Sequence, residues 1–476
     1  MAESTFDVCV IGAGAAGLSV AAGASQLGLK TVLIERSQMG GECLNSGCVP
    51  SKALLAAAKA AHRCEFTGIP GVSGQPPRVD FAAIKDGLRD VIATIAPHDS
   101  VERFRGLGVT VHRDTARFLD ARSIQVGAIR LQARRFVIAT GSKPAVPNIP
   151  GLDRSKILTN DNVFDLRDKP DHLVIIGGGP IGVEMAVAHR RLGSSVTVVE
   201  RASILPHDEP ELVDKLRDIM RGEGISLQEN VEITSIDHPF GGVVVRLRKD
   251  GADYAVSGSH LLVAAGREPV FDDLGLEAAG IAHDPKGILV DARLRTSQRH
   301  VFALGDVIDA PRFTHAAGYQ AGIVVRNLAF RLPAKAHYEA LPWVTYSDPE
   351  LAHVGLTEAK ARERYDGKVR IERVPLKGND RAVTERHPEG EIKIVLGSHA
   401  RVLGASILAP AAGEMIGLWC LAVSRKLTLR AITDLMLPYP TMGEIGKAAA
   451  SRYYQPTLFG ERTRRLVGAL QWLPPW

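Results

Sequence analysis

The sequence predicts an α/β protein with two copies of a βαβ unit, followed by a separate α+β domain at the C-terminal end. Three observations predict this fold: a glycine-rich turn between an apolar strand and a helix near the start, a second copy of that pattern 165 positions later, and a change of texture after Trp343. At roughly 100–200 residues per domain, the 476 residues suffice for three or four domains.

Composition and charge narrow the class of protein. Hydrophobic residues make up 45% and charged residues 23%, which is typical of a soluble globular protein, and a net charge of +5 does not indicate a nucleic-acid surface. There is no basic leader before an apolar run, no apolar run of membrane-spanning length, and only five cysteines. These features predict a cytoplasmic protein.

The first βαβ pattern opens with an apolar strand at 6–11. In a dinucleotide-binding unit the first glycine makes a tight turn, the second lets the backbone approach a pyrophosphate, and the third lets helix and strand pack closely. Gly12, Gly14 and Gly17 stand at these places. Glu35 ends the following strand, where an acid can accept hydrogen bonds from ribose hydroxyls.

The second copy begins with the strand at 173–176 and has Gly177, Gly179, Gly182 and Glu200 at the same places. In each copy the acid lies 23 positions after the first glycine. One three-glycine match is weak evidence, because glycine turns also occur in ordinary α/β proteins. Two complete copies, each with its strand, helix and acid, predict two Rossmann-like dinucleotide-binding domains.

A close cysteine pair, Cys43 and Cys48, stands just before a helix-forming run at 53–61. A helix N-terminus stabilises a thiolate and lowers its pKa, and dithiol exchange needs one thiol to attack and one to resolve. Two buried free cysteines and a two-cysteine metal clip are the alternatives. No further Cys or His lies at ligand spacing nearby, so the sequence predicts a redox pair and no metal site.

The two units are expected to bind different dinucleotides. FAD is usually retained by its enzyme, its unit commonly opens the chain, and the first copy leads directly into the cysteine pair. We therefore assign FAD to the first copy and the exchangeable nicotinamide to the second. Glu200 would repel the 2′-phosphate of NADPH and bond the free ribose hydroxyls of NADH. The adjacent Arg201 weakens this preference, and we expect NADH rather than NADPH.

The domain boundaries follow from linkers and strand ends. The proline-rich stretch at 143–151 and the stretch at 331–342 indicate linkers. We predict a first part of the FAD-binding domain at 1–147, an NAD(P)-binding domain at 148–269, a second part of the FAD-binding or central domain at 270–342 and a C-terminal domain at 343–476.

The chain resembles the class I pyridine nucleotide–disulfide oxidoreductases, which include dihydrolipoamide dehydrogenase, glutathione reductase and mercuric reductase. The resemblance runs essentially from end to end. The motifs that carry it are 12–17, 41–52, 139–141, 177–184, 266–269 and 305–306. It implies FAD, a nicotinamide cofactor and a C-terminal dimerisation domain that makes a homodimer.

The resemblance also implies roles for single residues. Cys48 resembles the thiol that lies against the flavin and forms a charge-transfer complex with it, and Cys43 the interchange thiol that faces the substrate. Lys52 and Glu184 resemble a lysine–glutamate pair beside the flavin ring, and Asp306 the acid that binds the ribityl chain. The cofactor-binding residues predicted from the motifs and the resemblance are Gly12, Gly14, Ala15, Gly17, Glu35, Arg36, Gly41, Glu42, Lys52, Ala116, Thr140, Gly141, Ser142, Gly177, Gly179, Ile181, Gly182, Glu200, Val231, Gly266, Arg267, Gly305, Asp306 and Ala316.

The C-terminal motif departs from the disulfide reductases. In those enzymes a histidine, oriented by a glutamate, comes from the other subunit and serves as acid–base for the interchange thiol. Here Glu444 is present, but Tyr439 replaces the histidine. A phenol with a pKa near 10 is a poorer base at neutral pH than an imidazole with a pKa near 6.5. Turnover of dihydrolipoamide or glutathione disulfide is therefore expected to be slow.

Tyrosine at this place is typical of mercuric reductases, which accept a soft metal on thiolates. Those enzymes also end in a vicinal cysteine pair, whereas this chain has no cysteine after Cys420. We interpret Cys9, Cys64 and Cys420 as small buried apolar residues. The last segment has Arg462, Arg464 and Arg465 before an apolar stretch that contains Trp472. That pattern suggests peripheral membrane contact, although packing at the dimer interface is the simpler interpretation.

The function predicted from these observations is an FAD-dependent NAD(P)H oxidoreductase of the mercuric-reductase-like branch. It passes electrons from NADH through FAD to the Cys43–Cys48 disulfide and on to a thiol/disulfide or metal-ion acceptor. The alternatives are a dihydrolipoamide dehydrogenase that uses Tyr439 and Glu444, a diaphorase or quinone reductase, and a redox-sensing flavoprotein.

Overall fold

A computed structural model describes residues 4–474 of the chain. Pro475 and Trp476, at the end of the predicted tail, lie outside the described residues. The chain divides into two compact units. The first contains residues up to His62, Pro76–Ser203 and Gly224–His337, and the second contains Arg63–Gln75, Ile204–Glu223 and the segment from Tyr338 onward.

The first unit contains a seven-stranded sheet in the order β3-β2-β1-β6-β5-β4, with β18 paired to β6. Strands β1, β2, β3, β6 and β18 run parallel to their neighbours within this group, and β5 is antiparallel to β4 and β6. The strands are β1 (Ser4–Ile11), β2 (Thr31–Ile34), β3 (Thr110–His112), β4 (Ala116–Asp120), β5 (Ser123–Val126), β6 (Ile129–Ile138) and β18 (Val301–Ala303).

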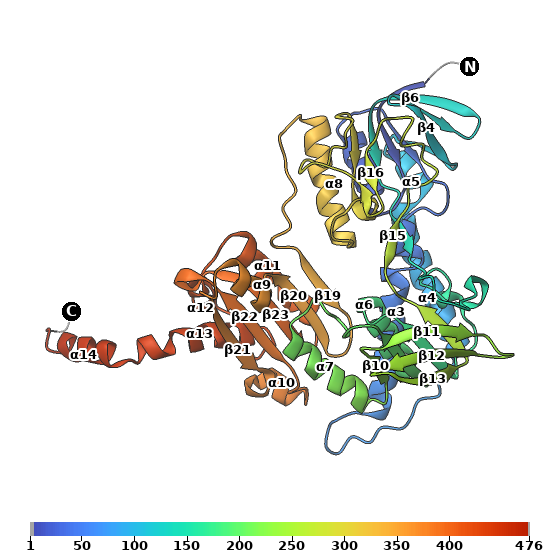
Figure 1. Ribbon diagram of the computed structural model, residues 1–476. Coiled ribbons are helices and arrows are strands. Elements are labelled where there is room, and N and C mark those ends of the chain that lie inside the picture. The colour runs from blue at the N-terminus through green and yellow to red at the C-terminus, as the bar shows by residue number, and fades with distance from the viewer. Residues whose placement is uncertain (1–3, 475–476) are drawn as a thin grey trace. The chain divides into compact units, whose positions relative to one another are not determined.

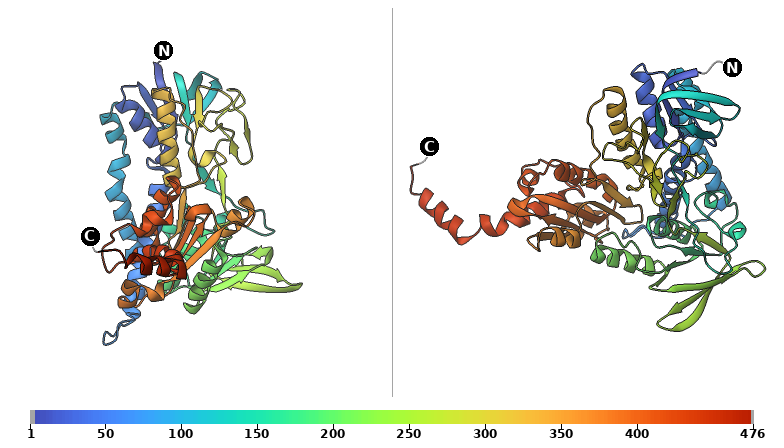
Figure 2. Two further views of the ribbon diagram at one scale, coloured as in Figure 1. Left: turned by 90° about the vertical axis from the view of Figure 1, so that its left-hand side faces the viewer. Right: turned by 45° about the horizontal axis from the view of Figure 1, so that its top comes forward.

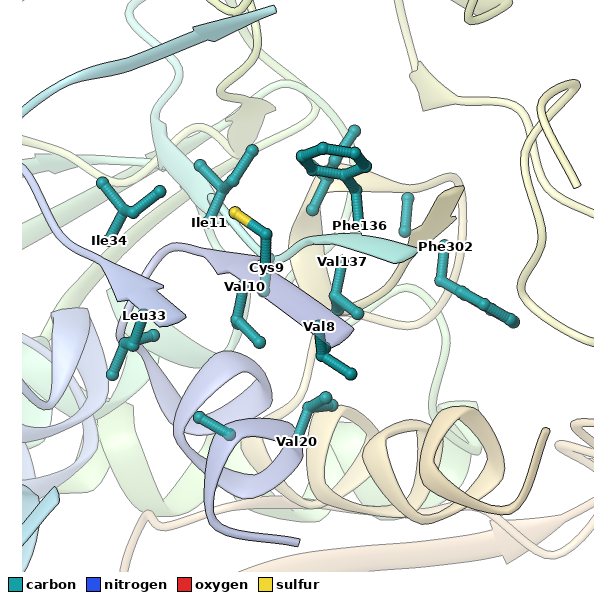
Figure 3. Close-up of a cluster of buried hydrophobic side chains, with 14 of the residues drawn as sticks. Val8, Cys9, Val10, Ile11, Val20, Leu33, Ile34, Phe136, Val137 and Phe302 are labelled. Atoms are coloured by element: carbon teal, nitrogen blue, oxygen red, sulfur yellow. The ribbon is translucent and has the colours of Figure 1, made fainter. Parts of the chain in front are cut away.

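The core of this sheet is continuous and apolar, as expected for parallel strands covered on both faces. Figure 3 shows Val8, Cys9 and Val10 of β1 beside Leu33 of β2 and Val137 of β6. Helices α1 (Ala15–Gln26) and α8 (Thr314–Ala329) lie side by side along one face. The other helices of this part are α2 (Gly41–Asn45), α3 (Cys48–Glu65), α4 (Phe81–Ile95) and α5 (Val101–Gly106).

The second βαβ pattern forms a separate four-stranded parallel sheet in the order β10-β9-β8-β14. A three-stranded antiparallel meander follows, visible in green in both views of Figure 2. These elements are β8 (His172–Ile176), α6 (Pro180–Arg191), β9 (Ser195–Glu200), β10 (Ser226–Glu229), β11 (Glu232–Asp237), β12 (Val243–Lys249), β13 (Ala252–Gly258) and β14 (His260–Val263). Two small ribbons pair β7 (Ser142–Pro144) with β15 (Arg267–Pro269) and β16 (His283–Asp284) with β17 (Gly287–Ile288).

The second unit is built on a five-stranded antiparallel sheet in the order β19-β20-β23-β22-β21 (Figure 1). Its core contains the fully buried Trp419 and the apolar faces of β22 and β23. The strands are β19 (Pro342–Thr345), β20 (Glu350–Gly355), β21 (Arg370–Pro375), β22 (Glu391–Leu396) and β23 (Val402–Ala409). The helices are α7 (Pro210–Gly222), α9 (Glu358–Arg364), α10 (Asp380–Thr384), α11 (Ala412–Ser424), α12 (Leu429–Thr433), α13 (Glu444–Leu458) and α14 (Glu461–Leu470). Short 3-10 turns lie at η1 (Ala96–Asp99), η2 (Arg154–Lys156), η3 (Val163–Asp165), η4 (Gly305–Val307), η5 (Leu376–Gly378) and η6 (Ser398–Ala400).

The fold class predicted from the sequence is confirmed, since both βαβ units and the C-terminal α+β part are present. Helix α7 belongs to the second compact unit, whereas β8 and β9 belong to the first. A buried ion-pair cluster accounts for this: Lys393 on β22 binds Glu209 at 2.8 Å, just before α7, and Glu358 at 2.8 Å. The predicted boundaries themselves stay a prediction.

Among the helices of residues 4–474, none combines the length and the apolar character needed to cross a membrane.

Candidate functional site

The first glycine-rich turn is shaped for a phosphate group. Gly12 has φ +101°, and a Cβ there would collide with the carbonyl oxygen of Ala139, while a Cβ on Gly17 would collide with the carbonyl oxygen of Gly12. By contrast, a Cβ on Gly14 would have its nearest neighbour 3.9 Å away, at the Cα of Gly41. Gly14 is the N-cap of α1 and has no side chain, so space remains over the free N–H groups of the first turn.

The second turn repeats these features residue by residue. Gly177 has φ +113° and its Cβ would collide with the carbonyl oxygen of Ala264, and Gly182 would collide with that of Gly177. Gly179 is the N-cap of α6, and among the described residues no heavy atom lies within 4 Å of a Cβ built on it. Both turns therefore fit the pyrophosphate of a dinucleotide.

The two acids have the same backbone contacts in both copies. Glu35 accepts hydrogen bonds from the N–H groups of Ala13 at 2.7 Å and Ser37 at 2.6 Å. Glu200 accepts them from Gly178 at 2.7 Å and Ala202 at 2.9 Å. Each acid thus fixes its glycine-rich turn. Because an ionised carboxylate has about four acceptor positions, each keeps capacity for ribose hydroxyls.

The cysteine pair lies between two short helical segments. Cys43 is in α2, Cys48 is the first residue of α3, and the hydroxyl oxygen of Thr314 lies 3.5 Å from the sulfur of Cys48. A hydrogen bond between the two thiols lowers the pKa of Cys48 to about 5, with further lowering by Thr314 and the charge of Lys52. The same hydrogen bond and burial raise the pKa of Cys43. Cys48 is therefore the thiolate of the pair and Cys43 the protonated thiol.

Lys52 and Glu184 form an ion pair with a distance of 2.8 Å between Nζ and Oε2. Lys52 lies one turn after Cys48 in α3, and Glu184 is nearly buried on α6. The pair joins the cysteine helix to the helix of the second βαβ unit. It places a positive charge near Cys48, which agrees with the lowered pKa of that thiol.

Replacing Lys52 by methionine is expected to raise the pKa of Cys48, since a positive charge that favours the thiolate is lost. In a Cys43→Ser background, which removes the thiol that lowers this pKa most, the rate of iodoacetamide alkylation should rise with pH through one midpoint, and through a higher midpoint when Lys52→Met is added. Lys59→Met removes the same charge about two turns further along α3 and serves as the control. Equal midpoints in all three proteins would contradict the assignment.

Four predicted residues form one polar network. Arg267 binds Glu42 in a bidentate ion pair and donates from Nε to the hydroxyl of Ser142 at 2.8 Å. Ser142 in turn donates to Asp306 at 2.7 Å. Burial raises the pKa of Glu42 to about 7, despite the opposing effect of Arg267. Asn160, which the sequence did not indicate, donates to Glu42 at 2.8 Å.

The other predicted cofactor residues lie around these turns and strands. The hydroxyl of Thr140 donates to the carbonyl oxygen of Val270 at 2.5 Å, and the N–H of Val231 donates to the carbonyl oxygen of Glu200 at 3.4 Å. Ala116 in β4 and Ala316 in α8 are buried, whereas Arg36 and Ile181 are exposed. Ala15 begins α1, and positive φ values occur at Gly41, Gly141, Gly266 and Gly305.

Tyr439 and Glu444 belong to the second unit and are not hydrogen-bonded to one another. The hydroxyl of Tyr439 donates to Asp380 at 2.8 Å, and the Tyr439 side chain is 71% exposed. Glu444 accepts a hydrogen bond from the N–H of Thr441 at 3.1 Å. The partner of the phenol is thus a residue 59 positions earlier in the chain, which sequence reasoning did not indicate.

All five cysteines are free thiols within the described residues. Cys9 is buried in the first sheet, as predicted, and Cys420 is partly buried. The expectation that Cys64 is buried is wrong, because it lies in the exposed last turn of α3. Within residues 4–474, no group of three or more Cys, His, Asp or Glu side chains is arranged to hold a metal ion.

The C-terminal helix α14 extends away from the sheet of its unit (Figure 1), and all its residues are at least partly exposed. Leu466, Val467 and Leu470 lie on one side of this helix, and Arg462 and Arg464 flank them. Trp472 beyond its end is 91% exposed. The predicted membrane contact stays a prediction.

Residues 6–321 match the family model described as pyridine nucleotide–disulphide oxidoreductase, and residues 341–450 match the dimerisation domain of that family. A mercuric reductase from Streptomyces lividans is 34% identical over 95% of this chain and 97% of its own length. Dihydrolipoyl dehydrogenase 3 of Pseudomonas aeruginosa is 35% identical over 94% and 98%.

Among solved structures, the HOCl-induced flavoprotein disulfide reductase RclA from Escherichia coli superimposes with a TM-score of 0.82 at 27% identity. The match covers 94% of this chain and 99% of that one. Members of the matched family use FAD and NAD(P)H, and the dimerisation domain supports a homodimer. The chain therefore belongs to the pyridine nucleotide–disulfide oxidoreductase family and is an FAD-dependent enzyme of that family.

Proposed function

We propose that this enzyme transfers reducing equivalents from NADH, by way of FAD, to a Cys43–Cys48 disulfide and on to a thiol/disulfide or metal-ion acceptor. The observation that carries the proposal is the contact between the two sulfurs, with the pKa of Cys48 lowered to about 5 and that of Cys43 raised. The opposite pKa shifts make one cysteine a stable thiolate and the other a protonated thiol. Electron transfer through a dithiol needs this difference, because the two sulfurs have different roles.

Bound FAD supplies a two-electron acceptor that can take a hydride from a nicotinamide and reduce a disulfide. The residues that would hold it are those of the first glycine-rich turn, Glu35, Lys52 and Asp306, while Gly179 and Glu200 would hold the nicotinamide dinucleotide. Reduction of the disulfide would consume one NADH and no net proton, because the hydride supplies both electrons and the one hydrogen that Cys43 keeps. It breaks the sulfur–sulfur bond and leaves Cys48 as the thiolate and Cys43 as the thiol or, after proton loss, the attacking group.

The acceptor we favour is a soft or borderline metal ion bound as substrate by the cysteine thiolates. Tyr439 in place of a histidine supports this choice, because delivery of electrons to a thiolate-bound metal does not need a strong proton acceptor. Mercuric reductases are among the relatives, and a Cu(II) complex is named for the structural neighbour from Escherichia coli. The partner subunit's Tyr439 and the partner subunit's Glu444 would complete the site in the homodimer.

A dihydrolipoamide dehydrogenase is the second candidate, and the Pseudomonas aeruginosa relative favours it. One panel decides between the candidates: NADH oxidation with Hg²⁺, Cu²⁺, lipoamide, glutathione disulfide and a quinone. Metal-dependent oxidation that is lost in Cys43→Ser supports the proposal. Fast lipoamide turnover by the wild type supports the alternative instead, and fast quinone turnover in Cys43→Ser or no turnover at all would point to a diaphorase or a redox sensor.

Histidine at position 439 offers a further distinction. If the missing base limits disulfide exchange, Tyr439→His should raise lipoamide turnover, since imidazole is a better base at neutral pH. Metal-ion turnover should not rise in the same variant.

NADH is the nicotinamide we propose, because Glu200 would oppose the 2′-phosphate of NADPH. In Glu200→Gln the preference for NADH over NADPH, measured as the ratio of kcat/KM values, should fall by roughly tenfold, which corresponds to about 1.4 kcal/mol. Glu229→Gln at the end of the neighbouring strand β10 is the control for charge removal in the same sheet. An unchanged ratio in Glu200→Gln would exclude Glu200 as the discriminating residue.

We also propose that the enzyme works in the cytoplasm, as its cysteine use suggests, and that the domain boundaries lie after residues 147, 269 and 342.

A further inference from the structure

The loop that carries Tyr439 is held by two consecutive residues at the start of α10. Asn379 donates from its side-chain amide to the carbonyl oxygen of Thr441 at 3.1 Å, and Asp380 accepts the hydroxyl of Tyr439 at 2.8 Å. Asn379 is nearly buried and also caps α10 by accepting from the N–H of Ala382 at 3.0 Å. The start of α10 is therefore a fixed support against which the phenol is oriented.

The hydroxyl of Tyr439 is hydrogen-bonded although its side chain is exposed. A phenol that is 71% exposed can be solvated by water and does not need a protein partner, yet this one donates to a carboxylate at 2.8 Å. Glu444, the residue expected to orient the group at position 439, is instead bonded to the N–H of Thr441. Asp380 thus makes the orienting contact that the family resemblance implies for Glu444.

We propose that Asp380 is a positioning residue of the site: it accepts the proton-bearing hydroxyl of Tyr439 and leaves the lone pairs of the phenol oxygen available to the substrate. The inference rests on the proposed role of Tyr439 beside the partner's cysteine pair. A carboxylate that orients an acid–base group through a hydrogen bond is a recurring arrangement in nucleophilic active sites. The hydroxyl hydrogen of Tyr439 is donated to Asp380 and is not available to the substrate. Toward a thiol the phenol therefore acts as a hydrogen-bond acceptor, and toward a metal ion as a neutral ligand.

Two charged groups act on the ionisation of Tyr439 in the described part of the chain. The hydrogen bond to Asp380 contributes most to a raised pKa, and the negative charge of Glu444 adds to it. Both disfavour the phenolate, so Tyr439 stays neutral at physiological pH. Loss of the Asp380 charge should make the phenolate form at lower pH.

The ionisation of Tyr439 can be measured as the difference between two proteins that differ only at position 439. Absorbance at 295 nm is followed against pH for holoenzyme, Tyr439→Phe, Asp380→Asn and the double variant. Asp366→Asn, alone and combined with Tyr439→Phe, is the control. Asp366 lies in an exposed loop at φ +49°, a conformation that asparagine also tolerates. Each variant with Tyr439 is compared with its Phe counterpart, and the difference gives the ionisation of this one phenol.

The expected result is a midpoint for Tyr439 that is lower in Asp380→Asn than in the wild type and unchanged in Asp366→Asn. Equal midpoints in the wild type and Asp380→Asn would overturn the proposal. Because this readout needs no acceptor, it stands even if the proposed electron acceptor is wrong.

Turnover with the acceptor found in the panel gives the second readout. Asp380→Asn and Tyr439→Phe should each lower kcat/KM by roughly tenfold, and the double variant should be no worse than the single ones, since both remove one interaction. The rate at which NADH bleaches the flavin should be unchanged. Multiplicative losses in the double variant would show that Asp380 acts independently of Tyr439 and would contradict the proposal.

Discussion

Cys48→Ser is expected to abolish reduction of the physiological acceptor, by roughly 10³-fold or more, while FAD remains bound. Serine cannot form the disulfide, and its hydroxyl does not ionise in the range in which the Cys48 thiolate forms, near pH 5. On anaerobic addition of NADH, the variant should also lack the long-wavelength absorbance band that a thiolate beside a flavin produces. A stopped-flow spectrum and an acceptor assay measure both effects.

Cys43→Ser is the matched variant for this prediction. It should lose acceptor turnover to the same extent but keep the long-wavelength band, because Cys48 and its neighbours Thr314 and Lys52 are untouched. If the band survived in Cys48→Ser and disappeared in Cys43→Ser, the two sulfur roles would be exchanged. If turnover survived in both, the sulfur relay would be excluded.

Gly179→Ala should raise the KM for NADH by roughly tenfold or more without disturbing the fold. A Cβ on Gly179 meets no heavy atom of the described chain within 4 Å, and φ at Gly179 is −73°, a value that alanine adopts readily. The added methyl group would instead stand over the N-terminus of α6, where the pyrophosphate is expected to bind. Steady-state kinetics, FAD content and a thermal melt separate binding from stability.

Gly177→Ala is the contrasting variant in the same turn. At φ +113°, and with the carbonyl oxygen of Ala264 in the place of a Cβ, alanine would be strained and would displace the backbone. This variant should melt at a lower temperature than the wild type. A Gly179→Ala enzyme with a normal KM, or with a lowered melting temperature like that of Gly177→Ala, would refute the assignment of the second turn to the nicotinamide dinucleotide.

Much of the fold was predictable because it depends on local patterns. Gly12 and Gly177 each follow an apolar strand and precede a helix, so strand, turn and helix can be recognised within about 25 residues. The attachment of α7 to the second unit was not predictable. It depends on Lys393, whose partners Glu209 and Glu358 are 184 and 35 positions away, and nothing local marks that lysine as buried.

Some residues of the candidate site could also be predicted from the sequence, and others could not. The pairing of Lys52 with Glu184 was expected from the family resemblance, and the structure brings these two residues together. Thr314 and Asp380 were missed, because a hydroxyl or carboxylate that orients another side chain from a distant segment has no spacing signature. The exposure of Cys64 was also missed, since the apolar character of cysteine favoured burial although the helix α3 ends in solvent there.

A count of thiols tests the central claim most directly. The chain has five cysteines, and the proposed relay uses Cys43 and Cys48, which leaves three as spectators. Oxidised holoenzyme, denatured anaerobically with a thiol reagent, should show three reactive thiols per subunit, and five after one equivalent of NADH. The same number of thiols before and after NADH would contradict the account.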